Sequence, residues 1–153
     1  QKFKTMQKLL SISLLSIIFF HTSLMAGDDW MTDFAAAKIK AAAEQKPLLL
    51  EFTGSDWCPP CMRLNKEVFS QVAFLDYAAK ELVIVKLDFP RSKVQSAELK
   101  AQNIALRDQF GVRGYPTVLL LTAEGKLIDQ TGYRRGGAEA YVEHLKDMLA
   151  SKR

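Results

Sequence analysis

Hydrophobic and polar positions alternate between extended and helical patterns after residue 26. The short apolar run Leu48 to Thr53 predicts a strand buried on both faces, and Leu82 to Asp88 predicts a second strand. Thr117 to Thr122 has the composition of a third strand, and Leu127 to Thr131 follows it after a short turn. These last two runs predict a β-hairpin.

Segments with helical spacing separate and follow these strands. They are Thr32 to Gln45, a helix that begins at the prolines 59 and 60, Ser70 to Lys80, Arg91 to Phe110, and Ala138 to Ser151. Strands that alternate with helices, followed by a hairpin and a closing helix, predict an α/β fold. We expect a central mixed sheet with parallel core strands and an antiparallel edge hairpin, flanked by helices.

Residues 1–26 follow a different pattern. Three lysines and no acidic residue precede the apolar run Leu9 to Phe20, and the segment ends at Ala26. This run is shorter than the roughly 20 apolar residues that cross a bilayer, which favours a secretory signal peptide over a membrane anchor. We therefore expect residues 27–153 to form one exported domain, periplasmic or secreted, without a membrane span.

The positive charge of the chain lies mostly in this leader. The whole sequence has 21 basic and 17 acidic residues and a formal net charge of +4, which falls to +1 without the leader's lysines. No run rich in lysine or arginine remains. The charge pattern thus gives no reason to expect binding of nucleic acid or of an anionic membrane.

The candidate chemistry lies in the two cysteines of the chain, Cys58 and Cys61. They follow a buried strand and begin a helix, so the free N–H groups of the helix start stabilise a thiolate at Cys58. Two intervening residues bring the second sulfur within bonding reach of the first. An exported protein can form disulfides, and this pair can open and close without refolding the domain.

The cysteine pair has other interpretations. It could be a fixed structural disulfide, or half of a zinc site, although such a site needs four ligands and only His21 and His144 are available. A binding module could also hold a partner protein or Cu(I) through two thiolates. Turnover of a disulfide substrate distinguishes an enzyme from such a module. We expect neither a cofactor nor a resident metal.

Two short motifs resemble those of the thioredoxin superfamily. Trp57-Cys58-Pro59-Pro60-Cys61 is similar to its WCxxC motif, and Gly114-Tyr115-Pro116-Thr117 is similar to its cis-proline loop. The similarity extends from about residue 33 to residue 150. The run Phe52-Thr53-Gly54-Ser55-Asp56-Trp57-Cys58 resembles exported bacterial thioredoxin-like proteins in particular.

This resemblance implies a thioredoxin-like fold and a thiol–disulfide oxidoreductase that acts on protein substrates. It makes Cys58 the attacking thiol and the exposed member of the pair, and Cys61 the shielded, resolving thiol. Trp57, Tyr115 and Pro116 are implied as substrate-binding residues, with a cis peptide bond before Pro116.

The resemblance also implies a buried acid, Glu51, faced by Lys86 from the neighbouring strand, which exchanges a proton with the resolving thiol. The family usually has an aspartate six residues before the first cysteine, whereas Glu51 stands seven before Cys58. We therefore assume an insertion of one residue after Thr53. A second departure is the stretch Arg91 to Gln102, which is longer than in thioredoxin; insertions in this family tend to shape partner choice.

The dipeptide between the cysteines bears on the direction of electron flow. Pro59 and Pro60 offer no N–H to the Cys58 sulfur, and the charge of Asp56 also disfavours the thiolate. We expect a reductase or isomerase rather than an oxidant. In an oxidising compartment this role requires a membrane or envelope partner that keeps the dithiol reduced.

Overall fold

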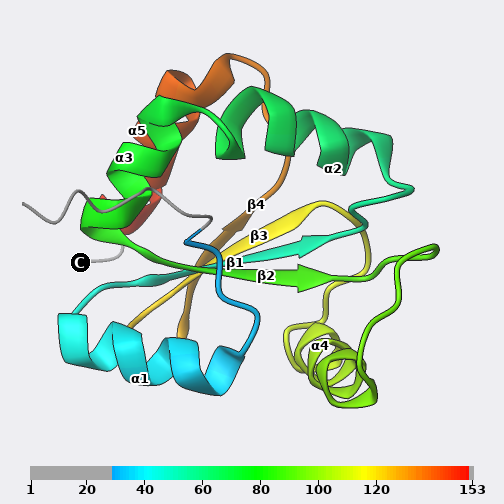
Figure 1. The fold of residues 1–153 in the computed structure, drawn as a ribbon. Helices are drawn as coiled ribbons and strands as arrows, with labels where there is room; N and C mark the ends of the chain where they lie inside the picture. The colour runs from blue at the N-terminus through cyan, green and yellow to red at the C-terminus, as the bar shows by residue number, and fades with distance from the viewer. Residues whose placement is uncertain (1–28, 152–153) are drawn as a thin grey trace, which may run out of the picture.

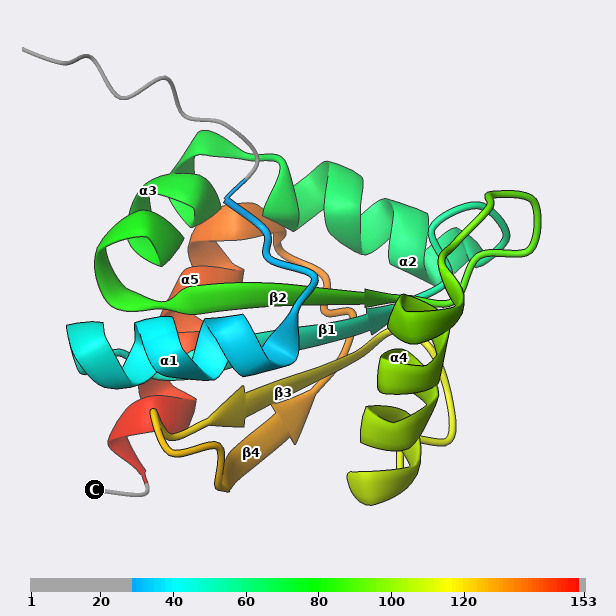
Figure 2. The same ribbon diagram turned by 60° about the horizontal axis from the view of Figure 1, so that its bottom comes forward.

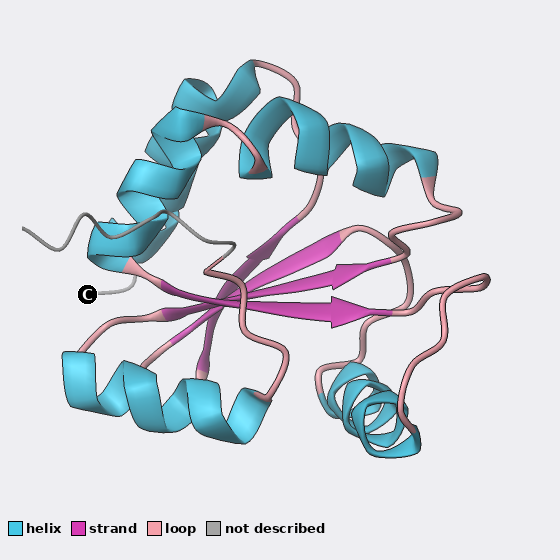
Figure 3. Cartoon of the chain, viewed as in Figure 1, coloured by secondary structure: helices cyan, strands magenta, loops and turns pink. Residues whose placement is uncertain are grey.

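Strands and helices alternate along the chain in the computed structural model, which describes residues 29–151. The elements are α1 (Phe34–Glu44), β1 (Leu48–Thr53), α2 (Pro59–Leu64), the π-helix η1 (Asn65–Phe69), α3 (Val72–Glu81), β2 (Val83–Asp88), α4 (Ala97–Gln109), β3 (Thr117–Leu121), β4 (Leu127–Thr131) and α5 (Gly137–Ala150). The sheet forms a middle layer, with α2, α3 and α5 on one face and α1 and α4 on the other (Figures 1 and 3).

The sheet has the strand order β2-β1-β3-β4 and is mixed, as the sequence predicts. β1 runs parallel to β2, and β3 runs antiparallel to both β1 and β4. The antiparallel part is thus larger than an edge hairpin. Phe52, near the end of β1, pairs with Thr117 at the start of β3. The segment 54–58, which follows β1, and the segment 114–116, which precedes β3, therefore lie at the same end of the sheet.

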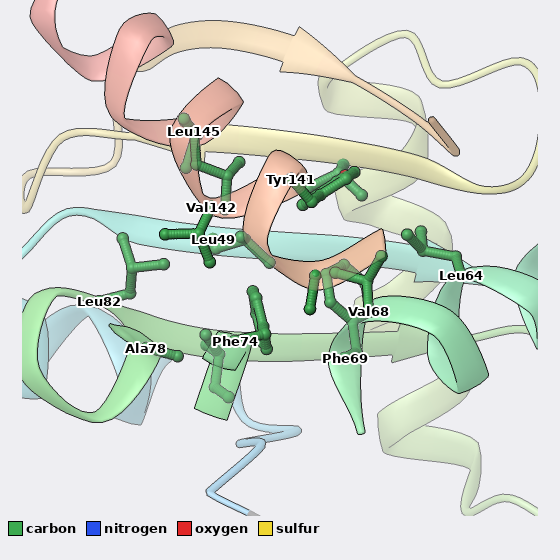
Figure 4. Packing of buried hydrophobic residues seen from close by; sticks show 14 of the residues in the cluster. Leu49, Leu64, Val68, Phe69, Phe74, Ala78, Leu82, Tyr141, Val142 and Leu145 are labelled. Atoms are coloured by element: carbon green, nitrogen blue, oxygen red, sulfur yellow. The ribbon is translucent and has the colours of Figure 1, made fainter. Parts of the chain in front are cut away.

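Side chains of β1 alternate between two hydrophobic cores. Leu49 packs beneath α2, α3 and α5 with Phe69, Phe74 and Tyr141, as Figure 4 shows from close by. Leu50, its neighbour, belongs to the core on the α1 and α4 side. Both faces of β1 are buried, which explains its unbroken apolar run. The same alternation turns Glu51 toward the face that α2 covers.

Two predicted helix starts are wrong. The helix predicted from Arg91 begins at Ala97, because the Ser96 hydroxyl accepts the Leu99 N–H at 3.2 Å and caps the helix there. Ser70 is not the cap of α3, which begins after Gln71. The preceding helix continues as η1 to Phe69, and the Ser70 hydroxyl donates to a carbonyl oxygen within it.

The predicted signal peptide at residues 1–26 lies outside the described residues. Within residues 29–151, none of the helices is long and apolar enough to cross a membrane.

Candidate active site

The two cysteines lie at the start of α2, after the short loop that follows β1. Cys58 is the N-cap of α2, and its Sγ accepts the Cys61 N–H at 3.3 Å. The two Sγ atoms are bonded at 2.04 Å. Pro59 and Pro60 occupy the first two helical positions, where a missing N–H breaks no intrahelical bond. The predicted placement of Cys58 at a helix start is confirmed.

Both cysteines are buried in this disulfide form. Cys61 is 1% exposed and is shielded, as predicted, whereas Cys58 at 4% is only slightly more accessible than its partner. The Cys58 sulfur is bonded to Cys61 and accepts the N–H of the same residue, which turns its side chain along the first turn of α2. The sequence places Cys58 at the helix start but does not reveal this orientation.

Trp57 joins the cysteine segment to the other segments at this end of the sheet. Its indole N–H donates to the Phe89 carbonyl oxygen at 2.7 Å, and its ring meets the Tyr115 ring edge-on at 5.9 Å. The Phe89 and Tyr115 rings are 5.0 Å apart. A Cβ on Gly54 would come within 2.5 Å of the indole, so only glycine admits the ring there. Trp57, Phe89 and Tyr115 form what we call the aromatic cluster.

The Tyr115–Pro116 peptide bond is cis, which confirms the prediction from the resemblance. Pro116 immediately precedes β3, and the Thr117 hydroxyl donates to the Gly114 carbonyl oxygen at 2.8 Å. The antiparallel register of β1 and β3 puts this loop at the same end of the sheet as Cys58. Burial raises the pKa of Tyr115 above its ordinary value.

Glu51 and Lys86 are register partners across the parallel β1–β2 pair. Glu51 is 1% exposed, so it is buried as the resemblance implies. Both side chains line a pocket of about 250 Å³ with Cys61, beneath α2. Burial, and then the charge of Glu51, raise the pKa of Tyr141. The structure thus brings the acid, the lysine and the second cysteine to one pocket.

Asp56 has a structural role that sequence reasoning missed. Its carboxylate accepts hydrogen bonds from the backbone N–H groups of Arg91 at 3.0 Å, Ser92 at 2.7 Å and Lys93 at 3.2 Å. These bonds, those of Arg91 and Ser92 foremost, hold the pKa of Asp56 below its ordinary value. Aspartate side chains often bind backbone N–H groups a few residues away in turns. The N–H groups that bind Asp56 are 35 to 37 positions away, so no local sequence pattern predicts these bonds.

A second contact ties the cysteine segment to the loop after β2. Ser55 donates its N–H and its hydroxyl to the Asp88 carboxylate at 3.0 and 2.6 Å. The Lys93 ammonium in turn donates to the Ser55 hydroxyl at 3.1 Å. Asp88 and residues 91–93 are therefore fixed beside the segment that carries Cys58.

His144, considered above as a zinc ligand, lies on α5, where its Nε2 is 3.0 Å from the Thr131 hydroxyl. Burial lowers the pKa of its imidazole. Within residues 29–151, no three His, Cys, Asp or Glu side chains gather as a metal site would require. His144 is thus a packing residue in this structure.

Comparison with known proteins agrees with the geometry. The family model described as a thioredoxin-like domain matches residues 34–149. The chain is 34% identical over 116 residues to disulfide bond reductase DsbH of Chlamydia pneumoniae, covering 76% of this chain and 70% of that protein. It is 31% identical to thioredoxin-related protein DsbJ of the same organism, but spans only 36% of that protein's length. A solved structure of DsbH oxidoreductase superposes with a TM-score of 0.76 at 34% identity, covering 79% of this chain and 83% of that one.

Proposed function

The chain belongs to the thioredoxin-like domain family, and from this premise we propose that it is a disulfide reductase for protein substrates outside the cytosol. The Cys58–Cys61 disulfide at the start of α2 carries this proposal. The prediction of a thiol–disulfide oxidoreductase is confirmed by relatives named as a disulfide bond reductase and an oxidoreductase. The leader pattern of residues 1–26 supports export.

The cysteines exchange two electrons with a substrate disulfide. In the reduced protein the Cys58 thiolate attacks one substrate sulfur, a mixed disulfide forms, and the other substrate sulfur leaves as a thiolate that takes a proton from water. Cys61 then loses its proton and attacks the Cys58 sulfur. The mixed disulfide breaks, the second substrate thiol is released, and the Cys58–Cys61 disulfide of this structure is the product.

Glu51 is the proposed acceptor of the Cys61 proton, and Lys86 orients its carboxyl group. Burial of Glu51 and the pocket that it shares with Cys61 and Lys86 support this role. The aromatic residues Trp57 and Tyr115, together with Pro116, form the proposed docking surface for an extended substrate segment.

Reduction of substrates leaves the protein oxidised, so each cycle needs a reductant. We propose a membrane or envelope redox partner, because the described chain has no cysteine besides Cys58 and Cys61 to accept electrons internally. The lack of N–H groups at Pro59 and Pro60 supports a reductase, since a less stabilised thiolate gives the electrons away more readily.

Reduction of insulin tests this function. The dithiothreitol-reduced protein, freed of reagent, should release the insulin B chain as a precipitate and become oxidised in a one-to-one ratio with the cleaved disulfides. Cys58→Ser should abolish the reaction. An intact insulin disulfide after prolonged incubation with the reduced protein would contradict the proposal and favour a binding module.

A further inference from the structure

Four basic side chains line a pocket beside the aromatic cluster. This pocket, of about 380 Å³, is lined by Arg91, Lys93, Lys100 and Arg107, with Phe89, Pro90, Gln95 and Ile104. None of these lining residues is acidic. We call it the basic pocket. Figures 1 and 2 both show the loop after β2 beside the loop between β1 and α2, and α4 following that loop on the other side of it.

The charge of this pocket is local. The chain without its leader is nearly neutral, at +1, so four cations in one pocket do not reflect a basic protein. Arg107 is paired with Asp108 at 2.7 Å. Among residues 29–151, Arg91, Lys93 and Lys100 form no ion pair within 4.0 Å. Arg91 and Lys100 are therefore exposed positive charges without an acidic partner within this part of the chain, whereas Lys93 reaches the Asp88 carboxylate through the Ser55 hydroxyl.

The loop that carries two of these cations is held in place. Three backbone N–H groups of the loop donate to the Asp56 carboxylate, so both of its oxygens accept hydrogen bonds from the backbone. The Arg91 guanidinium stacks over the Trp57 ring at 3.9 Å. Lys93 donates to Ser55 at 3.1 Å. Fixed positive groups lose little conformational entropy when they bind an anion.

The basic pocket lies next to the proposed docking surface, because Phe89 lines the pocket and contacts two residues of that surface. Phe89 lines the pocket, accepts the indole N–H of Trp57 and packs against Tyr115. The aromatic cluster connects the pocket to the residue before Cys58, because the Phe89, Tyr115 and Trp57 rings follow one another at distances of 5.0 and 5.9 Å. An extended polypeptide can follow this row of rings from the pocket to Cys58.

We propose that the basic pocket binds acidic side chains of protein substrates, in the segment that flanks the disulfide to be reduced. Carboxylates match the guanidinium of Arg91 and the ammonium groups of Lys93 and Lys100 in charge and in hydrogen bonding. This inference rests on the proposed function and adds a substrate class to it. It also gives the long stretch after β2 a role in substrate choice.

Three synthetic peptides test the inference. Each carries one cysteine as a neutral 2-thiopyridyl disulfide, flanked by glutamates, by glutamines or by lysines. The reduced protein cleaves this disulfide and is itself oxidised, so the released 2-thiopyridone reports the rate constant. At low salt we expect the glutamate peptide to react about tenfold faster than the lysine peptide, since steering by fixed charges has this scale. The difference should vanish near 1 M salt, where the Debye length is about 3 Å.

Lys100→Gln provides the decisive variant, because this exposed residue lines the pocket from α4 and not from the loop that is bonded to the cysteine segment. It should lower the glutamate-to-lysine rate ratio by about two- to threefold and leave the glutamine peptide unaffected. Lys126→Gln is the matched control: it removes the same charge at the β3–β4 turn, at the opposite end of the sheet from Pro116.

The possible outcomes distinguish failure of the substrate class from failure of the proposed function. Equal rates for the three peptides, or an equal loss of ratio in Lys126→Gln and Lys100→Gln, would overturn the inference while the proposed function stands. Absence of any Cys58-dependent reduction of the glutamine peptide and of insulin would instead remove the function. A preference for oxidised glutathione over cystamine, without discrimination among peptides, would assign the pocket to small acidic disulfides and overturn the substrate class proposed here.

Discussion

The Asp56 carboxylate accepts the Ser92 N–H at 2.7 Å across 36 positions of the chain. This bond and its neighbours join the segment before Cys58 to the loop after β2. The aromatic cluster and the basic pocket both depend on the placement of that loop, because Phe89 and Arg91 belong to it. From the sequence alone, Asp56 is only a negative charge near the cysteine. In the structure it organises the surroundings of the site.

The bonds to Asp56 should weaken in acid. Hydrogen bonds to the charged form lower the pKa of Asp56, so their contribution is complete above the ordinary aspartate value of about 3.9 and is lost as the pH falls through the lowered pKa. The amide proton shifts of Ser92 and Lys93 should therefore titrate together with a midpoint below about 3.9. Asp56→Asn should abolish this titration. A midpoint at or above the ordinary value would contradict the assignment.

Serine substitutions should separate the two cysteine roles. Cys61→Ser keeps the attacking thiol and removes the resolving one, so mixed disulfides with substrate should accumulate. Cys58→Ser should accumulate none, because Cys61 lines the pocket beneath α2, whereas Cys58 stands at the N-cap of that helix. Non-reducing electrophoresis and mass spectrometry of the adduct check both variants. An adduct on Cys61 in the Cys58→Ser protein would reverse the assignment.

Local sequence patterns predicted most of the fold. β1 and β4 have the predicted bounds, and the strand-to-helix junction at Cys58 follows from an apolar run before two prolines. Such features depend on residues that are close in sequence. The helix expected from Arg91 begins at Ala97 instead, where Ser96 caps it, and the distant Asp56 holds residues 91–93 in a loop before it.

The site was predictable in part for the same reason. The resemblance identified the cysteines and the cis bond at Pro116, and the strand register brings Glu51 and Lys86 together as expected. The burial of Cys58 escaped prediction, since it depends on the orientation of a bonded sulfur. The basic pocket also escaped prediction, because its cations come from two elements that meet only in the folded chain.

Glu51→Gln should slow the resolving step without unfolding the domain. The amide retains the shape of the carboxyl group but cannot take the Cys61 proton. If Glu51 is the general base, the rate of mixed-disulfide breakdown should fall by on the order of 10², while formation of the mixed disulfide is unchanged. Single-turnover quenching resolves these two steps. Glu124→Gln, in the exposed β3–β4 turn, is the control. Unchanged breakdown in Glu51→Gln would point to water as the acceptor.

Leu49→Ala should destabilise the domain without touching the site. Leu49 is fully buried between β1 and the layer formed by α2, α3 and α5 (Figure 4). Its truncation leaves a cavity and should lower the free energy of unfolding by about 2–5 kcal/mol. Ile39→Ala, at a position on α1 that is 74% exposed, should change it by no more than about 0.5 kcal/mol. Urea denaturation measures both, and comparable losses would contradict the packing described here.

The reduction potential of the Cys58–Cys61 pair should lie between those of thioredoxin and protein disulfide isomerase, at roughly −270 to −180 mV. The Cys61 N–H is the donor that the structure aims at the Cys58 sulfur, and it occupies the third helical position. Pro60, at the second position, removes the other donor that an N-cap side chain can bind. Titration against glutathione buffers, followed by alkylation, gives the potential directly.

Restoring that donor should make the pair more oxidising. Pro60→Ala adds an N–H at the second helical position, and a bond to the Cys58 thiolate worth one pKa unit would raise the potential by about 30 mV. Pro59→Ala is the matched control, because an N-cap side chain does not bind the first N–H and its shift should be smaller. Equal shifts in the two variants would show that loss of proline rigidity, rather than a new donor, sets the potential. A wild-type value near −120 mV would contradict the reductase and make the protein a disulfide donor.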